Sequence, residues 1–192
     1  ETVLMRILQG TGLQGLCGIR PQLVLKNIKF IRQLLDFPKK EFLNYIQHSA
    51  KKRKIVVILD EITSGWRITD GGVYKLNGFK PDIVVYGKAM GNGFAISAVV
   101  GKKQVMNQVQ ETFISSTFWT ERVGFVAALE TIRKLTKDKV WLHLDKVGSA
   151  IGSGWINLAK AHDLKMHVSE FNPLISFNFE YPEINSALYT LF

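Results

Sequence analysis

Two short apolar runs, each ending close to a polar residue, most constrain how this 192-residue chain folds. Residues 55–59 and 83–86 are continuous and rich in β-branched side chains, as strands buried on both faces are. Asp60 follows the first run directly, and Lys88 comes two residues after the second. Ligands gather at the carboxyl ends of strands in open α/β sheets. The pattern therefore predicts that Asp60 and Lys88 lie at one ligand-binding edge.

The flanking segments predict further strands and helices. Residues 27–50 have helical spacing in two pieces, which Pro38 separates. Residues 94–100 form a third strand candidate, and residues 167–170 and 174–179 form two more. Strands that alternate with helices indicate an α/β fold with a mostly parallel central sheet flanked by helices.

Two long helices are predicted in the second half of the chain. The first begins at Thr120, a residue type that often caps helix N-termini, and the second covers residues 139–161. Helical spacing places these apolar residues of the first helix on one face: Phe125, Leu129, Ile132 and Leu135. The same spacing predicts that the second helix buries Leu144, Val147, Ile151, Trp155 and Leu158.

Composition narrows the class of protein. Apolar residues make up 46% of the chain and charged residues 21%, which is typical of a globular protein. No apolar run reaches the length of a membrane span. Cys17 is the only cysteine, so a reducing, cytoplasmic location is the simplest expectation. The net charge is +9, but the densest basic run, residues 51–54, is interpreted as a solvated helix end. We therefore expect no nucleic-acid and no membrane partner.

The residue types at the two strand ends fit one cofactor. A suitably placed lysine can act as a nucleophile toward a carbonyl group, and a carboxylate can hold a cationic ring nitrogen. Pyridoxal phosphate requires both partners, a lysine for its aldehyde and an acidic group for its pyridinium nitrogen. Spacing alone leaves other interpretations open, because a lysine after a strand is usually a surface residue and an acidic pair there is commonly a cap or a turn.

Three segments resemble motifs of the class III pyridoxal-phosphate-dependent aminotransferases. Residues 59–67 (LDEITSGWR) resemble the aspartate segment of that family, and residues 81–93 (PDIVVYGKAMGNG) resemble its lysine segment. Residues 115–122 (SSTFWTER) are similar to its threonine turn before a long helix. The resemblance is closest to the branch that contains glutamate-1-semialdehyde aminomutase. It implies the large domain of a fold type I transferase.

The resemblance also implies roles for four residues. Lys88 would form a Schiff base with pyridoxal 5′-phosphate and then move the proton between the substrate carbon and the cofactor. Asp60 would pair with the pyridine nitrogen, and Ile62 would pack against one face of the ring. Thr117 would reach the cofactor phosphate of the neighbouring subunit, which implies a homodimer. The implied function is amino-group transfer between a small-molecule donor and acceptor, by a transaminase or an aminomutase.

Two further features of these segments bear on the site. Glu61 and Arg67 are expected to form a structural ion pair, with a place at the site entrance as the alternative. Residues 119–122 (WTER) depart from the small residues and Asn-Pro that follow the threonine in most family members. These bulkier residues suggest an altered substrate pocket.

The resemblance divides the chain into three parts. It assigns residues 27–164 to the PLP-binding large domain and residues 165–192 to the start of a truncated C-terminal small domain, and it leaves residues 1–26 unassigned. Neither the family's phosphate-binding Ser/Gly turn nor the aromatic residue over the ring has a match in residues 1–50. We therefore expect a fragment that is inactive in isolation. The alternative is a non-catalytic fragment or paralogue that acts in dimerisation or partner binding.

A glycine-rich segment near the start offers a competing nucleotide-binding hypothesis. Residues 10–15 (GTGLQG) fit the pattern G-x-G-x-x-G after an apolar run. A dinucleotide fingerprint also requires a helix that opens directly after the glycines, and Gly18 and Pro21 interrupt that stretch. A glycine-rich turn is the favoured interpretation.

Overall fold

The computed structural model describes residues 22–25, 28–31 and 40–181, with side chains described over 40–181. Strand β1 (Gln22–Leu25) pairs with β2 (Ile28–Ile31) as an antiparallel hairpin. The helix predicted at the start of residues 27–50 is therefore wrong where β2 lies. The backbone of β2 bonds to β1, and pairing with a neighbouring strand overrides helical spacing in so short a piece. The glycine-rich segment at residues 10–15 lies outside the described residues.

Helix α3 (Lys40–Lys52) confirms the second helical piece, after Pro38. It buries Leu43 and Ala50, and its other faces carry mainly polar residues. Glu41 lies in its first turn and Lys51 in its last, an order that favours the helix dipole. Residues 51–54 are exposed, which confirms the interpretation of this basic run as a solvated helix end.

The central sheet has the strand order β3 (Ile58–Asp60), β4 (Ile83–Tyr86) and β5 (Ala98–Gly101). Strands β3 and β4 are parallel, as predicted, but β4 and β5 are antiparallel. The connection between β4 and β5, residues 87–97, holds the 3-10 turn η1 (Lys88–Met90) and is too short for a crossover helix. It can therefore only return the chain antiparallel.

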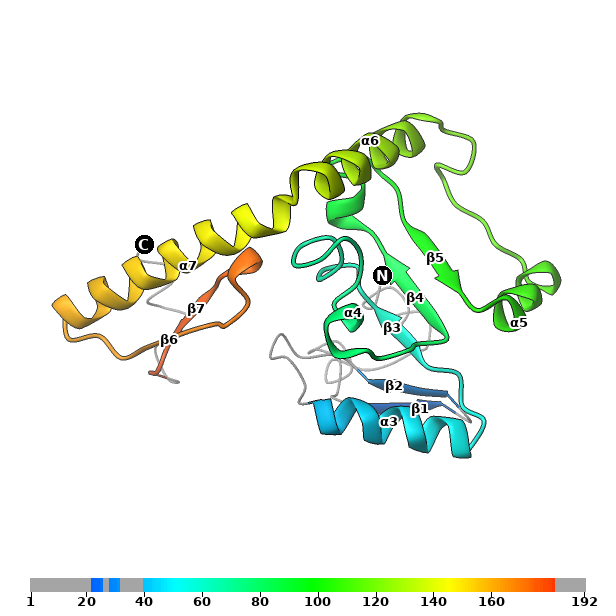
Figure 1. Cartoon of the computed structure of the whole chain (residues 1–192), viewed down its shortest axis with the longest axis horizontal. Helices are drawn as coiled ribbons and strands as arrows, with labels where there is room; N and C mark the ends of the chain where they lie inside the picture. The colour runs from blue at the N-terminus through cyan, green and yellow to red at the C-terminus, as the bar shows by residue number, and fades with distance from the viewer. Residues whose placement is uncertain (1–21, 26–27, 32–39, 182–192) are drawn as a thin grey trace, which may run out of the picture.

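Helix α6 (Val123–Asp138) lies beside η1, beyond the upper end of β4 in Figure 1. The core there consists of Val84, Tyr86, Met90 and Ala128, with Ile132 packed against it. The predicted face is wrong for two residues, because Phe125 is 57% and Leu129 is 69% exposed. Small residues make the contact instead: a Cβ on Gly124 would lie 2.7 Å from the backbone oxygen of Ala95.

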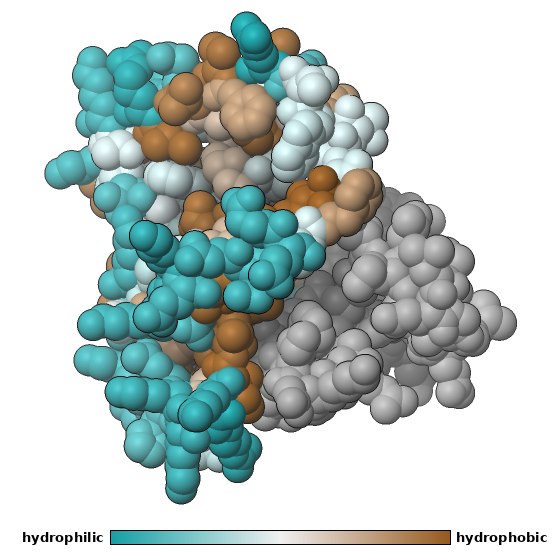
Figure 2. Space-filling model, turned by 90° about the vertical axis from the view of Figure 1, so that its right-hand side faces the viewer, coloured by the Kyte–Doolittle hydropathy of each residue, from teal (hydrophilic) through white to brown (hydrophobic). Residues whose placement is uncertain are grey.

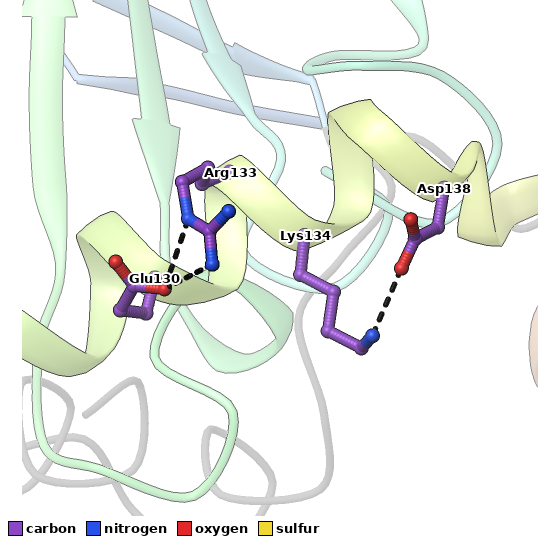
Figure 3. Close-up of polar contacts among 4 residues, drawn as sticks. All are labelled: Glu130, Arg133, Lys134 and Asp138. Carbon is purple, nitrogen blue, oxygen red and sulfur yellow. Dashed lines mark hydrogen bonds and ion pairs between the residues drawn. The ribbon is translucent and has the colours of Figure 1, made fainter.

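The start of α6 also differs from the prediction. Its N-cap is Arg122 rather than Thr120, and a turn at residues 117–120 precedes it. On the solvent side of α6, Arg133 bonds Glu130 at 2.8 Å and Lys134 bonds Asp138 at 2.8 Å (Figure 3). Residues three and four apart face each other on a helix, so both pairs support helix formation locally.

The C-terminal part is built on helix α7 (Val140–Ala161), which extends away from the sheet in Figure 1. Strands β6 (Met166–Val168) and β7 (Phe177–Phe179) form an antiparallel pair beside it and confirm the two predicted strands in shorter form. The 3-10 turn η3 (Asn172–Leu174) lies against α7. The domain boundary between residues 164 and 165 stays a prediction.

The buried face of α7 differs from the predicted stripe of large residues. Leu144 and Trp155 are half-buried, but Val147, Ile151 and Leu158 are 41%, 41% and 59% exposed. The helix buries Gly148, Gly152 and Ala159 instead. Trp155 contacts Phe177 edge-on, with ring centroids 5.0 Å apart. Short side chains on α7 therefore let η3 and the β6–β7 pair approach its backbone.

Large apolar side chains remain exposed on several elements. Val56 and Ile58 are 41% and 44% exposed, so the prediction of a strand buried on both faces is wrong for β3 within the described residues. Figure 2 views the side that carries β5 and the segment before α6, and apolar residues gather in its upper half.

The remaining elements are α4 (Tyr74–Asn77), α5 (Lys103–Met106) and η2 (Asn107–Glu111). None of the described helices combines the length and hydropathy that crossing a membrane requires.

Candidate active site

The parallel pair β3–β4 brings Asp60 and Lys88 to the same edge of the sheet. Asp60 pairs with Val85 in the register, and the ladder continues through Glu61 N, which donates to Val85 O at 2.8 Å. Asp60 is exposed, and its Oδ1 accepts from the backbone N–H of Ile62 at 3.0 Å. One carboxylate oxygen therefore shapes the turn after β3, while the side chain stays accessible to a ligand.

Lys88 has an unusual backbone conformation. Its φ is +43°, in the left-handed region that residues other than glycine rarely adopt. The Lys88 carbonyl accepts hydrogen bonds from the backbone N–H groups of Gly91 at 3.1 Å and Asn92 at 3.0 Å, which hold this conformation. Such strain costs on the order of 1–3 kcal/mol and is concentrated at functional sites. The side chain of Lys88 is exposed.

The loop after β3 contacts both Lys88 and the residue before it. The Lys88 Nζ donates a hydrogen bond to Thr63 Oγ1 at 2.8 Å. Ile62 lies against Gly87, because a Cβ at Gly87 would be 3.4 Å from Ile62 Cγ2. The structure thus places Asp60, Ile62 and Lys88 at one edge of the sheet and adds Thr63, while the roles of the first three at a cofactor stay predictions. Sequence reasoning missed Thr63, although its hydroxyl lies inside the motif already singled out.

Glu61 holds the loop after β3 through hydrogen bonds of its buried side chain. Its side chain is fully buried, it accepts a hydrogen bond from the Ser64 hydroxyl, and it accepts another from Tyr74 N at 3.3 Å. Burial raises the pKa of the Glu61 carboxyl above its usual value, although the hydrogen bonds from Ser64 and from the backbone oppose that change. The carboxyl is therefore a structural part of the loop.

The predicted ion pair between Glu61 and Arg67 is wrong in the part of the chain that the structure describes. Arg67 Nε instead donates to the backbone oxygen of Thr63 at 2.7 Å. Burial lowers the pKa of the Arg67 guanidinium, as expected for a cation partly removed from water. Both side chains are thus structural, but each holds the loop through a different partner.

We expect Glu61→Gln to remove a pH dependence of stability. The Glu61 carboxyl binds its proton more tightly in the folded chain than in the unfolded chain, which releases it above about pH 4.5. The contribution of this proton to the free energy of unfolding is therefore complete below that pH. It is lost as the pH rises through the raised pKa of the folded state. Urea unfolding of the wild-type chain and the variant, repeated at pH values from about 4 to about 8, measures the difference in the free energy of unfolding. Parallel stability curves would contradict this assignment, and exposed Glu111→Gln is the matched control.

The loop after β3 packs against the aromatic ring of Tyr86. Tyr86 is buried at the end of β4, and its ring lies 5.9 Å from that of Trp66. A Cβ on Gly65 would lie 2.7 Å from Tyr86 Cδ1 and 2.7 Å from the backbone oxygen of Glu61. Glycine is therefore required where the loop crosses this ring. Burial raises the pKa of the Tyr86 hydroxyl, so Tyr86 stays neutral.

The segment that contains Thr117 runs along another part of the sheet. Every residue from 111 to 122 is exposed, and the segment passes from η2 to α6 on the side of β5 away from β4 (Figure 1). Phe113 is 95% and Trp119 is 62% exposed in the same segment. The contact of Thr117 with a cofactor phosphate in a neighbouring subunit stays a prediction.

Comparison with protein families gives two matches. The family described as "Aminotransferase class-III" matches residues 35–189, which is most of the chain. The family described as "PP-loop domain" matches residues 1–56. The two matches overlap at residues 35–56, which include α3.

Curated relatives agree with the first match. A 3-aminobutyryl-CoA aminotransferase from Cloacimonas acidaminovorans is 41% identical over 107 residues, covering 55% of this chain and 26% of the relative. A 2′-deamino-2′-hydroxyneamine transaminase from Streptomyces kanamyceticus is 33% identical, covering 70% and 34%. A glutamate-1-semialdehyde 2,1-aminomutase from Nitrosopumilus maritimus is 34% identical, covering 69% and 31%. The chain spans a third or less of the length of most of these relatives.

Solved structures show the same fold. The FumI protein of Sphingopyxis sp. MTA144, in its PLP internal aldimine form, has a TM-score of 0.69 at 21% identity, covering 80% of this chain and 36% of that one. An omega-transaminase from Sphaerobacter thermophilus has a TM-score of 0.63 at 27% identity, covering 74% and 33%. These are fold type I enzymes, and class III aminotransferases use pyridoxal phosphate. By its fold, its two strand-end motifs and the family match over residues 35–189, the chain belongs to the class III aminotransferase family.

Proposed function

We propose that this chain supplies the lysine and the ring-nitrogen partner of a PLP-dependent enzyme that transfers amino groups. One observation carries the proposal: the Lys88 amine and the Asp60 carboxylate lie at the ends of adjacent parallel strands. The donor set fits pyridoxal phosphate, since an amine can bind its aldehyde and a carboxylate can bind its pyridinium nitrogen. Ile62, which lies against Gly87 between them, offers an apolar surface to the ring.

Bound pyridoxal phosphate supplies an aldehyde for the amine and an electron-accepting ring. Asp60 would keep the ring nitrogen positively charged, because its carboxylate lies at the exposed end of β3. Lys88 would hold the cofactor through its amine, and when that amine is free it could take up and give back a proton, because a neutral amine and its ammonium form act as base and acid. The turn at Gly91 and Asn92 fixes the lysine backbone during these steps.

The substrates are a small-molecule amino donor and acceptor. Relatives of this chain include two named transaminases and a named 2,1-aminomutase, and both reaction types fit the same lysine and carboxylate. We propose the general reaction, amino-group transfer between or within small molecules, without a choice between the two. The bulky segment at residues 119–122 is exposed and would alter the substrate pocket.

Covalent capture of the cofactor tests the proposal. The chain is mixed with pyridoxal 5′-phosphate, reduced with borohydride and digested, and the modified peptides are identified by mass spectrometry. We expect the adduct on Lys88 at low cofactor concentration, ahead of exposed Lys80. Equal modification of both lysines would argue against the proposal.

Asp60→Asn is expected to weaken cofactor binding while preserving the turn. Asparagine keeps an oxygen for the Ile62 N–H but loses the charge that the ring nitrogen requires. Loss of a charge-assisted hydrogen bond costs about 1–2 kcal/mol at an accessible site, or roughly tenfold in affinity. Titration of the Lys88 adduct against cofactor concentration measures the change. Asp70→Asn removes an exposed carboxylate from the same loop and should leave the titration unchanged.

The wider assembly is part of the proposal. The exposed segment around Thr117 and the exposed apolar residues of α6 support a homodimer in which Thr117 reaches the partner's cofactor phosphate. We propose that the isolated chain binds the cofactor weakly and is inactive, because it covers only 26% and 31% of the length of two of its relatives. A cytoplasmic location is proposed on the basis of the single cysteine, Cys17.

A further inference from the structure

The Lys88 amine has a hydroxyl partner in the loop after β3. Its Nζ donates a hydrogen bond to Thr63 Oγ1 at 2.8 Å, although the side chain of Lys88 is otherwise exposed. A lysine side chain has many rotamers, and an exposed one samples most of them. The contact with Thr63 therefore determines where the amine rests.

Thr63 is itself held from two sides. Its backbone oxygen accepts a hydrogen bond from Arg67 Nε at 2.7 Å, and Arg67 is half-buried. The turn is closed by Gly65 N, which donates to Glu61 O at 2.8 Å, and Glu61 is fully buried. The Thr63 hydroxyl is thus presented to Lys88 from a backbone that the loop fixes.

The left-handed backbone conformation of Lys88 helps to orient its side chain toward Thr63. With φ at +43°, the side chain leaves β4 on the side where the β3 loop lies, and Thr63 meets it there. Asp60 is three residues before Thr63 in the same loop. The amine is therefore held by the same loop that carries Asp60.

We propose that Thr63 is a positioning residue for Lys88. Its hydroxyl holds the amine, whenever that amine is not bonded to the cofactor, in the orientation from which it attacks the cofactor aldehyde. The reaction in this inference rests on the proposed function, whereas the contact between Thr63 and Lys88 does not. In the reaction, Nζ bonds to the aldehyde carbon, and the aldehyde oxygen leaves as water with two hydrogens from the neutral amine. No oxidant or reductant is required.

Two aldehydes of different size test the proposal on the full chain. Pyridoxal 5′-phosphate must dock before it reacts, whereas acetaldehyde reacts with any accessible amine. Each adduct is trapped with cyanoborohydride, and the rate at Lys88 is divided by the rate at exposed Lys80, read by mass spectrometry. The variants are Thr63→Val, which keeps the shape of the side chain without its hydroxyl, and Thr63→Ser, which keeps the hydroxyl.

The two aldehydes should respond in opposite directions. In Thr63→Val the ratio with pyridoxal 5′-phosphate should fall roughly tenfold, because a misplaced amine loses the advantage of orientation. The ratio with acetaldehyde should rise about threefold, because the amine is released from one hydrogen bond. Thr63→Ser should restore both ratios to near the wild-type values.

Thr69→Val is the matched control. Thr69 lies in the same loop, but its hydroxyl donates to the backbone oxygen of Gly72 at 3.1 Å. If Thr69→Val reproduces both changes, general loosening of the loop is the cause and the proposal is overturned. Unchanged ratios in Thr63→Val also overturn it. Thr63→Ala provides a second variant without the hydroxyl if circular dichroism shows that the valine variant does not fold.

The acetaldehyde ratio separates this proposal from the proposed function. If pyridoxal 5′-phosphate fails to prefer Lys88 over Lys80 in the wild-type chain, the proposed cofactor chemistry fails. The acetaldehyde ratio then still decides whether Thr63 holds the amine, because that reaction needs no cofactor site.

Discussion

Lys88→Ala is expected to abolish covalent capture of pyridoxal 5′-phosphate at this site. Alanine has no amine, and Lys88 is the lysine that follows the strand next to the one ending at Asp60. Alanine is also about as strained as lysine at a φ of +43°, so the backbone cost is nearly unchanged. The absorbance band of the cofactor adduct and the mass of the reduced peptide measure the loss.

Two matched variants sharpen this experiment. Lys88→Arg keeps the positive charge but removes the amine nucleophile, so it should also lose the adduct. Lys80→Ala removes an exposed lysine outside the site and should keep the Lys88 adduct at the wild-type level. An adduct of wild-type intensity in Lys88→Ala would show that capture occurs at other lysines, and the role of Lys88 would be rejected.

Gly148→Ala is expected to cause the largest loss of stability among simple substitutions in α7. A Cβ at this position would lie 1.9 Å from the backbone oxygen of Asn172 and 2.5 Å from its carbonyl carbon. Backbone atoms cannot move aside as the end of a flexible side chain does, so α7 and η3 must separate. Overpacking of this kind costs typically about 1–3 kcal/mol, and a contact this short belongs at or above the upper end.

Gly154→Ala on the same helix is the matched control. A Cβ there meets no heavy atom within 4 Å, and Gly154 is exposed. Alanine is favoured over glycine inside a helix by about 1 kcal/mol, so this variant should be more stable than the wild type. Urea unfolding followed by circular dichroism measures both variants. Equal stability of the two would contradict the close packing of α7 on η3.

The sequence predicted the local elements better than it predicted their packing. Residues 55–59 and 83–86 were expected to be strands, and β4 has the predicted bounds while β3 begins three residues later than predicted. Local composition decides such elements, because β-branched runs favour strands wherever they pair. Asp60, Ile62 and Lys88 could be proposed as site residues because their motifs are continuous in sequence. Thr63 could not, because its role depends on a lysine 25 residues away.

The buried faces of α6 and α7 show why the packing could not be predicted from the sequence. Spacing placed the large residues of α6 and α7 in the core, yet Leu129 and Leu158 are 69% and 59% exposed. Amphipathic spacing identifies an apolar stripe but not the distance at which a partner packs. Close approach of backbones at Gly124 and Gly148 instead requires small residues.

The sequence by itself determined that the chain has an α/β fold and that a carboxylate and a lysine follow two β-branched strands. Only the tertiary structure decided that β5 runs antiparallel, that glycines form the helix contacts, and that Thr63 holds the Lys88 amine. The reason is physical: propensity and motif are local properties of the chain. Strand direction, backbone distance and the partner of an exposed amine depend on residues that only folding brings together.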